Sequence, residues 1–536
     1  MKKIYTLLLV SLTLLAVSCS TKSLDIQQHG VTTLDKYATA NDAEANQFIA
    51  AVYSVIRGDG YEAVLGGGPA TFYYVNYQLG KMSDEFAEGF AYNETASSGT
   101  YSGMWSYYYK IAYWCSMIIE KLPANEMASS GVKTRIIAEA RAIRAIAMMQ
   151  LVQLWGNPPL ANHVMDGSEG NTPAEESWAF IEKELTEAAE VLPSKAGLGG
   201  QAAIGGRLTK EAAYAYLGKA QLWQKKYGDA ANTLYNHVIS TGKYELNPVF
   251  DNLNGSVNDF GDENIWEFDF DNSAANATAQ EGCFDLACFN PNIYWSGKYA
   301  FLMLAWGMGS FPSSSYAEFM MGHDATIDWT TFSMNTSSRY QGTLTDYWGL
   351  LMGGSVPLDN PISGCQGYFR LKDVCWADDL VGDFPYYYSK RNVVYMRYAE
   401  VLLNYAEAVA CGGSNGSGLT GLQALNLVRQ RAGLDAAPEL SMDNDTYGVK
   451  AERRAELFGE GQRFIDLVRW GDAPTVLADC GKKTYMTNVA EGYMGYEVVD
   501  SETGGPGFVA GKNELFPIPE TDINNNPAGL KQNPNW

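Results

Sequence analysis

Apolar and small residues recur at the spacing of one helix face through much of this 536-residue chain. The clearest run predicts one long helix ending near the residues GNPP at 156–159, with inward positions Ala140, Ile143, Ala147, Leu151 and Leu154. Comparable runs predict helices within 174–192, 213–223, 229–238, 398–410, 421–431 and 452–468. Because the contact positions are often alanine, neighbouring helices can approach closely, and the chain should fold as packed helix pairs.

The helix pairs set the expected fold class. Alanine, tryptophan and tyrosine at these spacings are typical of tetratricopeptide-type hairpins, although the chain keeps no strict 34-residue period. The sequence TPAE at 172–175 predicts a capping box that opens one helix. Residues 245–395 differ, since glycine, asparagine, serine and aromatic residues dominate there and only WEFDF at 266–270 alternates like a strand. We expect a mostly α fold, a tetratricopeptide-like helical superhelix with long ordered loops and a few short strands.

The first residues form a targeting segment. Lys2 and Lys3 precede an apolar run at 5–17 that is too short to span a bilayer. The run ends in LAVSC at 15–19, which resembles a bacterial lipobox; an ordinary signal peptide with an incidental cysteine is the other interpretation. We expect a lipoprotein signal peptide at 1–18, lipidation of Cys19, a tether at 19–35, and a single domain at 36–536 with a loop-rich insertion at about 245–395.

Composition and motifs argue against several functions. The formal net charge of -23 would repel a nucleic acid. None of the four histidines has a second metal-type ligand at helical or turn spacing, so we expect no zinc site and no cofactor. The sequence GSGLTG at 416–421 follows a predicted helix rather than a strand and is interpreted as a turn. A Ca²⁺ site stays open among Asp251, Asn254, Asp259 and Asp262.

Carboxylate pairs and cysteines leave alternatives open. The acidic pairs nearest to a glycosidase pattern are Ser83-Asp84-Glu85 and Asp269 with Asp271, and their other interpretation is a turn cap and a solvated strand edge. The sequence contains neither a GxSxG nor a Walker motif, and we expect a protein that is not an enzyme. Cys283 with Cys288, or Cys365 with Cys375, would close small loops, and free buried thiols are the alternative.

An ordered set of motifs runs along the chain. The C-terminal motif is NELFPIP at 513–519, and the others are EARAIRA at 139–145, RLTKEAA at 207–213, RYAEVLLNYAEA at 397–408, VRQRAGL at 428–434, ERRAELF at 452–458 and GQRFIDLVRWG at 461–471. Together with Ser83-Asp84-Glu85 and the lipobox, the set resembles the SusD/RagB-like outer-membrane lipoproteins of Bacteroidetes.

The resemblance implies both a scaffold and a function. It implies a right-handed tetratricopeptide-like superhelix, attachment to the outer membrane by the lipid at the cell surface, and capture of a glycan for a SusC-like TonB-dependent transporter. The motif arginines read as structural, and we expect buried ion pairs and bidentate bonds from Arg397, Arg453, Arg454, Arg463 and Arg469. The stiff Pro-Ile-Pro tail should lie against the helices.

The family motifs contain no ligand-binding residues, so the ligand contacts are predicted from the chemistry of sugar binding. A pyranose stacks its apolar face on tryptophan or tyrosine and bonds its hydroxyls to polar side chains. Aromatic residues cluster at 72–109, where 12 of 38 residues are aromatic, and again at 292–306. Residues 105–109 are expected in the core. The predicted contacts are Tyr294, Trp295, Tyr92, Asn93, Tyr73, Tyr74, Trp306 and Trp348.

The sequence is compatible with three functions. The preferred one is a cell-surface lipoprotein that captures an oligo- or polysaccharide and delivers it to the transporter. The same fold could bind a peptide or another non-sugar nutrient, since fold does not decide ligand. A glycoside hydrolase is the third, and it would require two carboxyls converging across a cleft. The sequence does not specify which glycan is bound.

Overall fold

The computed structural model describes residues 37, 39–57, 72–87, 89–195, 206–268, 293–296, 299–302, 311–328, 330, 333–346, 362–373, 376–383, 386–389, 391–416, 418–489, 496–502 and 505–536. Cys19 and the predicted signal peptide and tether lie outside these ranges, as do Cys283, Cys288 and Cys375. In the described part of the chain, no helix is both long enough and apolar enough to cross a membrane.

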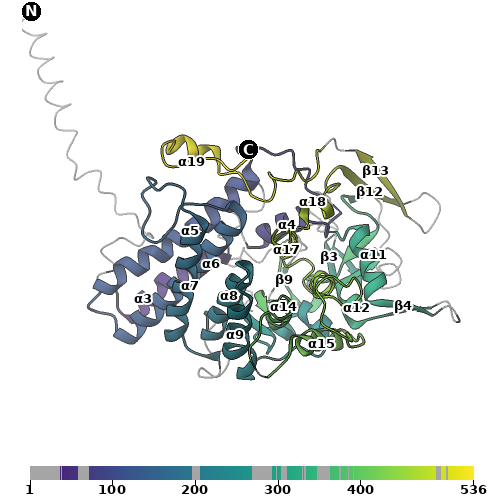
Figure 1. Ribbon diagram of the computed structural model, residues 1–536, viewed down its shortest axis with the longest axis horizontal. Coiled ribbons are helices and arrows are strands. Elements are labelled where there is room, and N and C mark those ends of the chain that lie inside the picture. The colour runs from purple at the N-terminus through teal and green to yellow at the C-terminus, as the bar shows by residue number, and fades with distance from the viewer. Residues whose placement is uncertain are drawn as a thin grey trace, which may run out of the picture.

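A curved array of antiparallel helices forms one side of the molecule (Figure 1). It contains α5 (Gly99–Lys121), α6 (Ser130–Trp155), α7 (Ala174–Val191), α8 (Lys210–Trp223) and α9 (Tyr227–His237), each packed on the next. The array continues from α9 to α14 (Tyr398–Ala410) and α15 (Gly421–Ala432), and α3 (Asp42–Arg57) covers α5 and α6. The mostly α, tetratricopeptide-like class is therefore confirmed.

The helix ends show where local patterns were interpreted correctly and where they were not. The long helix ends at Trp155, and Gly156 follows it with a positive φ of 72°, as the sequence predicts. The prediction of a capping box at 172–175 is wrong. Pro173 is the N-cap of α7, and the Thr172 hydroxyl accepts a hydrogen bond from the Leu160 N–H at 3.2 Å instead. A capping box does form at α15, between Thr420 and Gln423, and it follows the predicted glycine-rich turn.

The region from about 245 to 395 is built of short strands and helices. Its antiparallel pairs are β2 (Ile293–Ser296) with β3 (Tyr299–Leu302), β4 (Ala325–Asp328) with β5 (Ser333–Thr336), β6 (Leu344–Asp346) with β8 (Tyr368–Arg370), and β9 (Leu380–Asp383) with β10 (Tyr386–Ser389). Helices α11 (Ser314–His323) and α12 (Ser338–Thr343) lie among them. This region occupies the other side of the molecule in Figure 1.

The predicted strand at 266–270 is confirmed for residues 266–268, since 269 and 270 lie outside the described ranges, and its burial differs from the prediction. Strand β1 (Asn264–Phe268) pairs with β11 (Val393–Arg397), and all five of its residues are buried. An alternating strand would leave one face exposed. Here β1 is covered on the array side by α8, and Glu267 is bonded by Asn264 at 3.0 Å and Asn392 at 3.1 Å. The strand therefore lies between the two halves of the molecule.

The C-terminal third of the chain packs against both the helical array and the loop-rich region. Helices α16 (Val449–Glu456) and α17 (Arg463–Trp470) pack on α14 and α4 (Phe72–Lys81), respectively, and α18 (Ala473–Val476) follows. Strands β12 (Lys483–Val489) and β13 (Tyr496–Glu502) form a hairpin that pairs with β7 (Ile362–Ser363). The last helix, α19 (Glu520–Asn525), lies over α5 in Figure 1.

The C-terminal tail is fastened to the helical array, as predicted. The Trp155 indole N–H donates to the Pro517 carbonyl at 2.9 Å, and the Phe516 N–H donates to the Leu154 carbonyl at 2.7 Å. Asn533 closes the contact by donating to the Trp155 carbonyl at 3.0 Å. Since Trp155 is fully buried and its ring centre lies 5.3 Å from that of Phe516, the tail is part of the core.

Candidate functional site

The loop between α4 and α5 carries the predicted contacts Tyr92 and Asn93. Tyr92 has a left-handed backbone with φ of 55°, which is costly for a bulky side chain and persists only where the surroundings hold it. Its ring is 3% exposed and packs edge-on against Phe90 and Phe508, and its hydroxyl donates to the Met82 carbonyl. Tyr92 offers no exposed ring to a sugar, which corrects that expectation: it is a buried anchor of the loop.

Asn93 follows the anchor and is exposed. The next residue, Glu94, accepts hydrogen bonds from the hydroxyls of Ser98 and Thr100, the second at 3.1 Å, so the loop is tied to the start of α5. Asn93 is therefore a polar side chain held at the surface by a fixed backbone. Loops fixed on a rigid scaffold are a usual place for ligand contacts.

The base of this loop is fastened to the C-terminal half. Arg463 forms a two-bond contact with the Asp84 carboxylate, at 2.7 and 3.1 Å, and Arg454 lies 2.7 Å from the same group. Although burial favours the neutral acid, these guanidiniums lower the pKa of Asp84 to about 2. Burial, with the Asp84 charge beside it, raises the pKa of Glu85 to about 8. Neither carboxyl lines the cavities described below.

The other predicted contacts are only partly described. Tyr73 and Tyr74 lie in the first turn of α4, and Tyr294 and Trp295 lie in β2 opposite Phe301 and Ala300. For these four residues the backbone is described and the side chains are outside the description. Trp306 and Trp348 lie outside the described residues altogether, as do Asp269 and Asp271. Their roles as contacts stay predictions.

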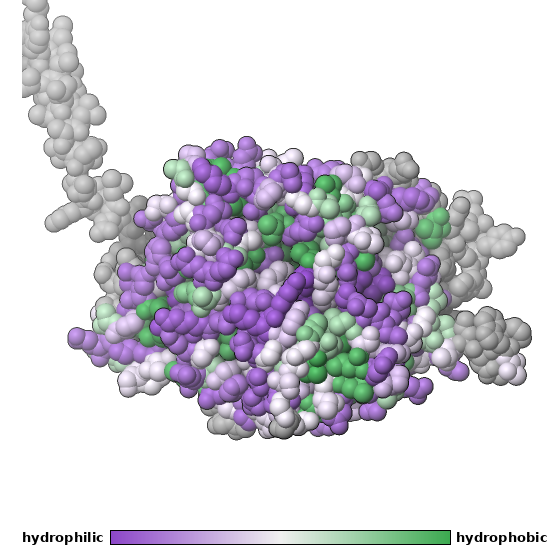
Figure 2. All heavy atoms as spheres, in the orientation of Figure 1, coloured by the Kyte–Doolittle hydropathy of each residue, from purple (hydrophilic) through white to green (hydrophobic). Residues whose placement is uncertain are grey.

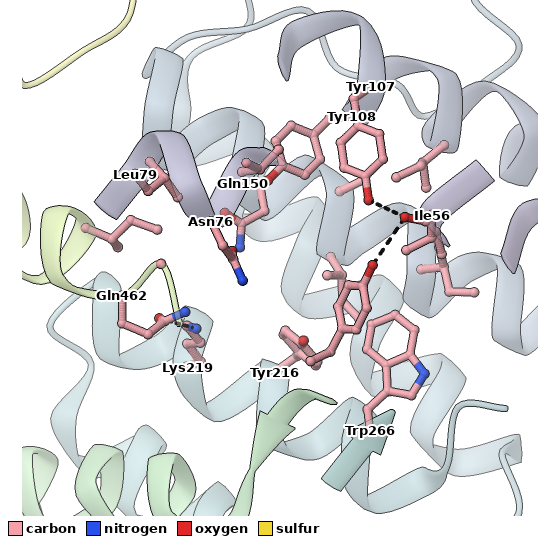
Figure 3. Close-up of a pocket in the computed structure, with 18 residues that line it drawn as sticks. Ile56, Asn76, Leu79, Tyr107, Tyr108, Gln150, Tyr216, Lys219, Trp266 and Gln462 are labelled. Atoms are coloured by element: carbon pink, nitrogen blue, oxygen red, sulfur yellow. Dashed lines mark hydrogen bonds between the residues drawn. The ribbon is translucent and has the colours of Figure 1, made fainter. Parts of the chain in front are cut away.

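A cavity of about 620 Å³ lies where the helical array meets the rest of the molecule. Helices α3, α4, α5, α6 and α8 surround it together with β1, β11 and the start of α17 (Figure 3). Its aromatic lining is Tyr107, Tyr108, Tyr216, Trp266 and Tyr395, and its polar lining is Asn76, Gln150, Lys219 and Gln462. In Figure 2, hydrophobic residues reach the surface near the junction between the array and α4, among polar neighbours. We call this space the central cavity.

A second, more polar chamber of about 650 Å³ adjoins the central cavity and shares three of its lining residues, Asn76, Tyr395 and Gln462. Its walls add the charged side chains Lys372, Asp373, Arg391, Arg397, Glu400 and Glu460. Most of these charges are already paired: Lys372 lies 2.5 Å from Glu460, and Arg397 lies 2.6 Å from Glu263.

Beside this chamber lies a buried network of charges. Arg339 is fully buried and forms two bonds with Asp324, both 2.9 Å, and further bonds with Glu452 at 2.5 Å and Glu456 at 3.1 Å. Against the effect of burial, the neighbouring arginines Arg431 and Arg397 lower the pKa of Glu456 to about 2. The network joins α12 of the loop-rich region to α16 and has no opening for a substrate, so we assign it a structural role.

The predicted role of the motif arginines is confirmed. Arg453 forms a two-bond contact with Asp466, at 2.7 and 3.0 Å, and Arg469 contacts Glu407, with one bond of 2.7 Å. Arg397, Arg454 and Arg463 make the pairs given above. Arg397, Arg454, Arg463 and Arg469 pair with residues far away in the sequence, whereas Arg453 joins α16 to the next helix, α17.

The predictions about metal binding and cysteine pairing can be checked only for the described residues. Within those ranges, no group of three or more His, Cys, Asp or Glu side chains could hold a metal ion. Of the four residues considered for Ca²⁺, Asn254 bonds the Gly342 carbonyl at 2.8 Å, Asp259 accepts from the Asn392 N–H at 2.9 Å, and Asp262 points outward beside Lys195. The fourth residue, Asp251, accepts from the Asn254 side chain at 3.2 Å. The two predicted cysteine pairings each include a residue outside the described ranges and stay untested.

Comparison with known proteins identifies the family. Residues 262–536 match the model of the SusD family, and residues 66–222 match a second family described as "Starch-binding associating with outer membrane". The chain belongs to the SusD family, as its motifs suggest. A SusD-like protein from Bacteroides ovatus is 23% identical over 452 residues, which cover 80% of this chain and 77% of the relative. SusD-like protein P25 of Formosa agariphila is 23% identical over 404 residues, 72% and 73% of the two chains.

Solved structures share the fold along nearly the whole chain. A laminarin-binding SusD-like protein has a TM-score of 0.65 at 24% identity and covers 92% of this chain and 100% of its own. Surface glycan-binding protein A from Bacteroides fluxus has a TM-score of 0.67 at 22% identity, with 92% and 99% covered. The corresponding protein from Bacteroides thetaiotaomicron, solved in complex with laminarihexaose, has a TM-score of 0.65 at 19% identity, with 92% and 100% covered.

Proposed function

We propose that this protein is a lipid-anchored binding protein of the outer-membrane surface that captures a glycan and delivers it to a SusC-like TonB-dependent transporter. The observation that carries the proposal is membership of the SusD family, supported by a second family match described as starch-binding and associated with the outer membrane. Several solved relatives of the same fold are named as glycan-binding proteins. Binding without catalysis is part of the proposal.

The contact surface we propose consists of the loop that presents Asn93, the first turn of α4 with Tyr73 and Tyr74, and the β2–β3 hairpin with Tyr294 and Trp295. Trp306 and Trp348 complete the set. Aromatic rings would stack on sugar faces, while Asn93 would bond hydroxyls. The exposed position of Asn93 on an anchored loop supports this choice.

Glycan binding can be tested on the full-length protein in a detergent without a sugar headgroup. Polysaccharides, including laminarin, are screened by affinity electrophoresis, and the best ligand is measured by calorimetry. By analogy with base stacking, Trp295→Ala should cost about 1–3 kcal/mol of binding free energy. Asn93→Ala should cost about 1 kcal/mol. The control is Asn236→Ala, another exposed asparagine, on α9 of the array.

Each alternative predicts a different result. A folded Trp295→Ala variant that binds the polysaccharide unchanged would refute the contact surface. New reducing ends after incubation would identify a glycoside hydrolase instead, and saturable binding of peptides without any glycan binding would identify a peptide-capture protein. For the anchor, Cys19→Ser should move the protein from the membrane fraction to the soluble fraction.

A further inference from the structure

The two sides of the central cavity differ in chemistry. In Figure 3, Tyr108, Gln150 and Asn76 lie along one side, and the rings of Tyr216 and Trp266 lie opposite them. One side therefore offers amide and hydroxyl groups, and the other offers the rings of Tyr216 and Trp266, which are 4% and 1% exposed but, unlike Tyr92, line the cavity. A single sugar ring has the complementary pair of surfaces, a ring face of C–H groups and an edge of hydroxyls.

Several polar groups of the cavity make no hydrogen bond with the described protein. Tyr107 and Tyr395 both donate to the Ile56 carbonyl, at 2.8 and 3.3 Å. In contrast, within the described ranges neither the hydroxyls of Tyr108 and Tyr216 nor the side-chain amides of Asn76 and Gln150 have a protein partner. Tyr108 is 8% exposed and Tyr216 is 4% exposed. Buried polar groups are nearly always bonded in native proteins, so the two buried tyrosine hydroxyls are suited to bonding a bound molecule, and the half-buried amides of Asn76 and Gln150 can join them.

The sequence holds one of these amides against the cavity by close packing. Gly461 has a φ of 70°, and a Cβ atom built there would lie 2.6 Å from the Asn76 side-chain oxygen. Glycine at this position therefore lets α4 approach the segment before α17 and keeps Asn76 at the boundary between the two chambers. This placement would be lost with any larger residue at 461.

Charge and size restrict the ligand further. Lys219 is the charged residue of the cavity lining, and it is neutralised by Glu400 at 2.6 Å and bonded to Gln462 at 2.7 Å. The lining therefore favours a neutral molecule. The lining surrounds the space from several helices and two strands, an enclosure that suits one small molecule rather than a polymer.

We propose that the central cavity is a second, internal site that binds one neutral sugar unit, separate from the surface contacts proposed above. Tyr216 and Trp266 form the stacking side, while Asn76, Gln150 and Tyr108 bond the hydroxyls. The choice of a sugar rests on the proposed function, whereas the cavity and its unbonded polar groups do not. Gln462, which lines both the central cavity and the adjoining polar chamber, would also contact the bound sugar unit.

The test uses the full-length protein, in a detergent without a sugar headgroup, and methyl glycosides of glucose, galactose, mannose and xylose. Ligand-observed NMR and calorimetry measure binding. Gln150→Leu keeps the side-chain volume but removes the amide, and Ala147→Met fills the cavity from α6. Gln150→Leu should weaken the best methyl glycoside roughly three- to ten-fold, the effect of one lost hydrogen bond. Ala147→Met should abolish its binding.

Two controls separate the cavity from the surface site and from folding. Gln430→Leu makes the same exchange at an exposed position of α15 and should change nothing. Trp295→Ala should weaken polysaccharide binding and leave the methyl glycoside untouched. Because the Gln150 amide has no partner in the described protein, Gln150→Leu should not lower the melting temperature, which a purely structural role would require.

Three results would overturn the inference. The first is methyl glycoside binding that neither Gln150→Leu nor Ala147→Met alters. The second is polysaccharide binding without any methyl glycoside binding, which would leave the surface site standing alone. The third is tighter binding of cyclohexanol, a ring with a single hydroxyl, than of any methyl glycoside, since the cavity would then be an apolar site. Absence of all glycan binding would refute the proposed function as well.

Discussion

Removing the fully buried Arg339 should destabilise the protein more than any exposed charge change. Its guanidinium contacts three carboxylates, Asp324, Glu452 and Glu456, at 2.5–3.1 Å. After Arg339→Met, which keeps an apolar chain of similar length, all three would lose this bond inside the protein. Breaking a buried ion pair from one side costs about 3–5 kcal/mol.

The remaining partners decide where in that range the value falls. Glu452 keeps Arg429 at 2.9 Å, and Glu456 keeps Arg397 at 2.9 Å, so these two stay paired with a cation. Within the described part of the chain, the Asp324 carboxylate keeps only its bonds with the side chains of Ser337 and His323, both 2.6 Å. We therefore expect the loss to fall on Asp324, and Arg339→Met to cost about 3–4 kcal/mol of the free energy of unfolding.

Urea unfolding followed by far-ultraviolet circular dichroism measures this cost, and two further variants check its origin. Asp324→Asn combined with Arg339→Met removes the stranded charge and should recover about half of the loss. Lys226→Met breaks a half-exposed pair with Glu182 and should cost less than about 1 kcal/mol. An Arg339→Met variant within about 1 kcal/mol of the wild type would refute the reasoning.

Two other predictions concern pH and the tail. Burial raises the pKa of Glu85 to about 8 and those of Asp259 and Glu267 to about 7, so their contribution to stability is full below the unfolded pKa and is lost as pH rises through 7 to 8. Glu456, with a pKa lowered to about 2, acts in the opposite sense, because its contribution to stability is lost as the pH falls from about 4 toward 2. The melting temperature should therefore be highest between the acid and the neutral ranges and fall on both sides. Asn533→Ala removes buried bonds to two carbonyls and should cost about 1–3 kcal/mol in the same urea assay, whereas an unchanged value would show that the tail contributes nothing to the core.

Local patterns were sufficient to predict α6 to α9, α14, α15 and the tail, but the predicted helix at 452–468 is two helices, α16 and α17, and α11 and α12 lie where loops were expected. The inward positions of α6 are set by a spacing within one segment, and the stop at Gly156 requires only a residue that tolerates a positive φ. The aromatic residues at 105–109 were expected in the core, and Trp105, Tyr107 and Tyr108 are buried there while Tyr109 is half-buried against it. Tyr92 was assigned wrongly because a tyrosine in a loop can either face the ligand or anchor the loop, and only its contacts with Phe90 and Phe508 decide between the two.

The central cavity could not be predicted, because its lining comes from segments between Ile56 and Ile465 that no window of the sequence contains together. Tyr108 and Gln150 lie at ordinary helix positions, and nothing local distinguishes an unbonded buried hydroxyl from a bonded one. Tyr107 and Tyr108 are neighbours in sequence, yet the first bonds the Ile56 carbonyl and the second has no protein partner in the described part. To predict the cavity, one would first have to know which distant segments of the chain pack against each other.

The position of Asp84 explains why the family motifs do not identify the ligand. This residue lies at the base of the loop that presents Asn93, and its two-bond contact with Arg463 spans 379 residues of sequence. Arg454, from another motif, contacts the same carboxylate. The motif residues thus hold the loop in place from below, where a change would release it. If the proposed sites at the loop tip and in the cavity bind the ligand, the motif charges specify only the frame that carries those sites, and the fold alone does not decide the ligand.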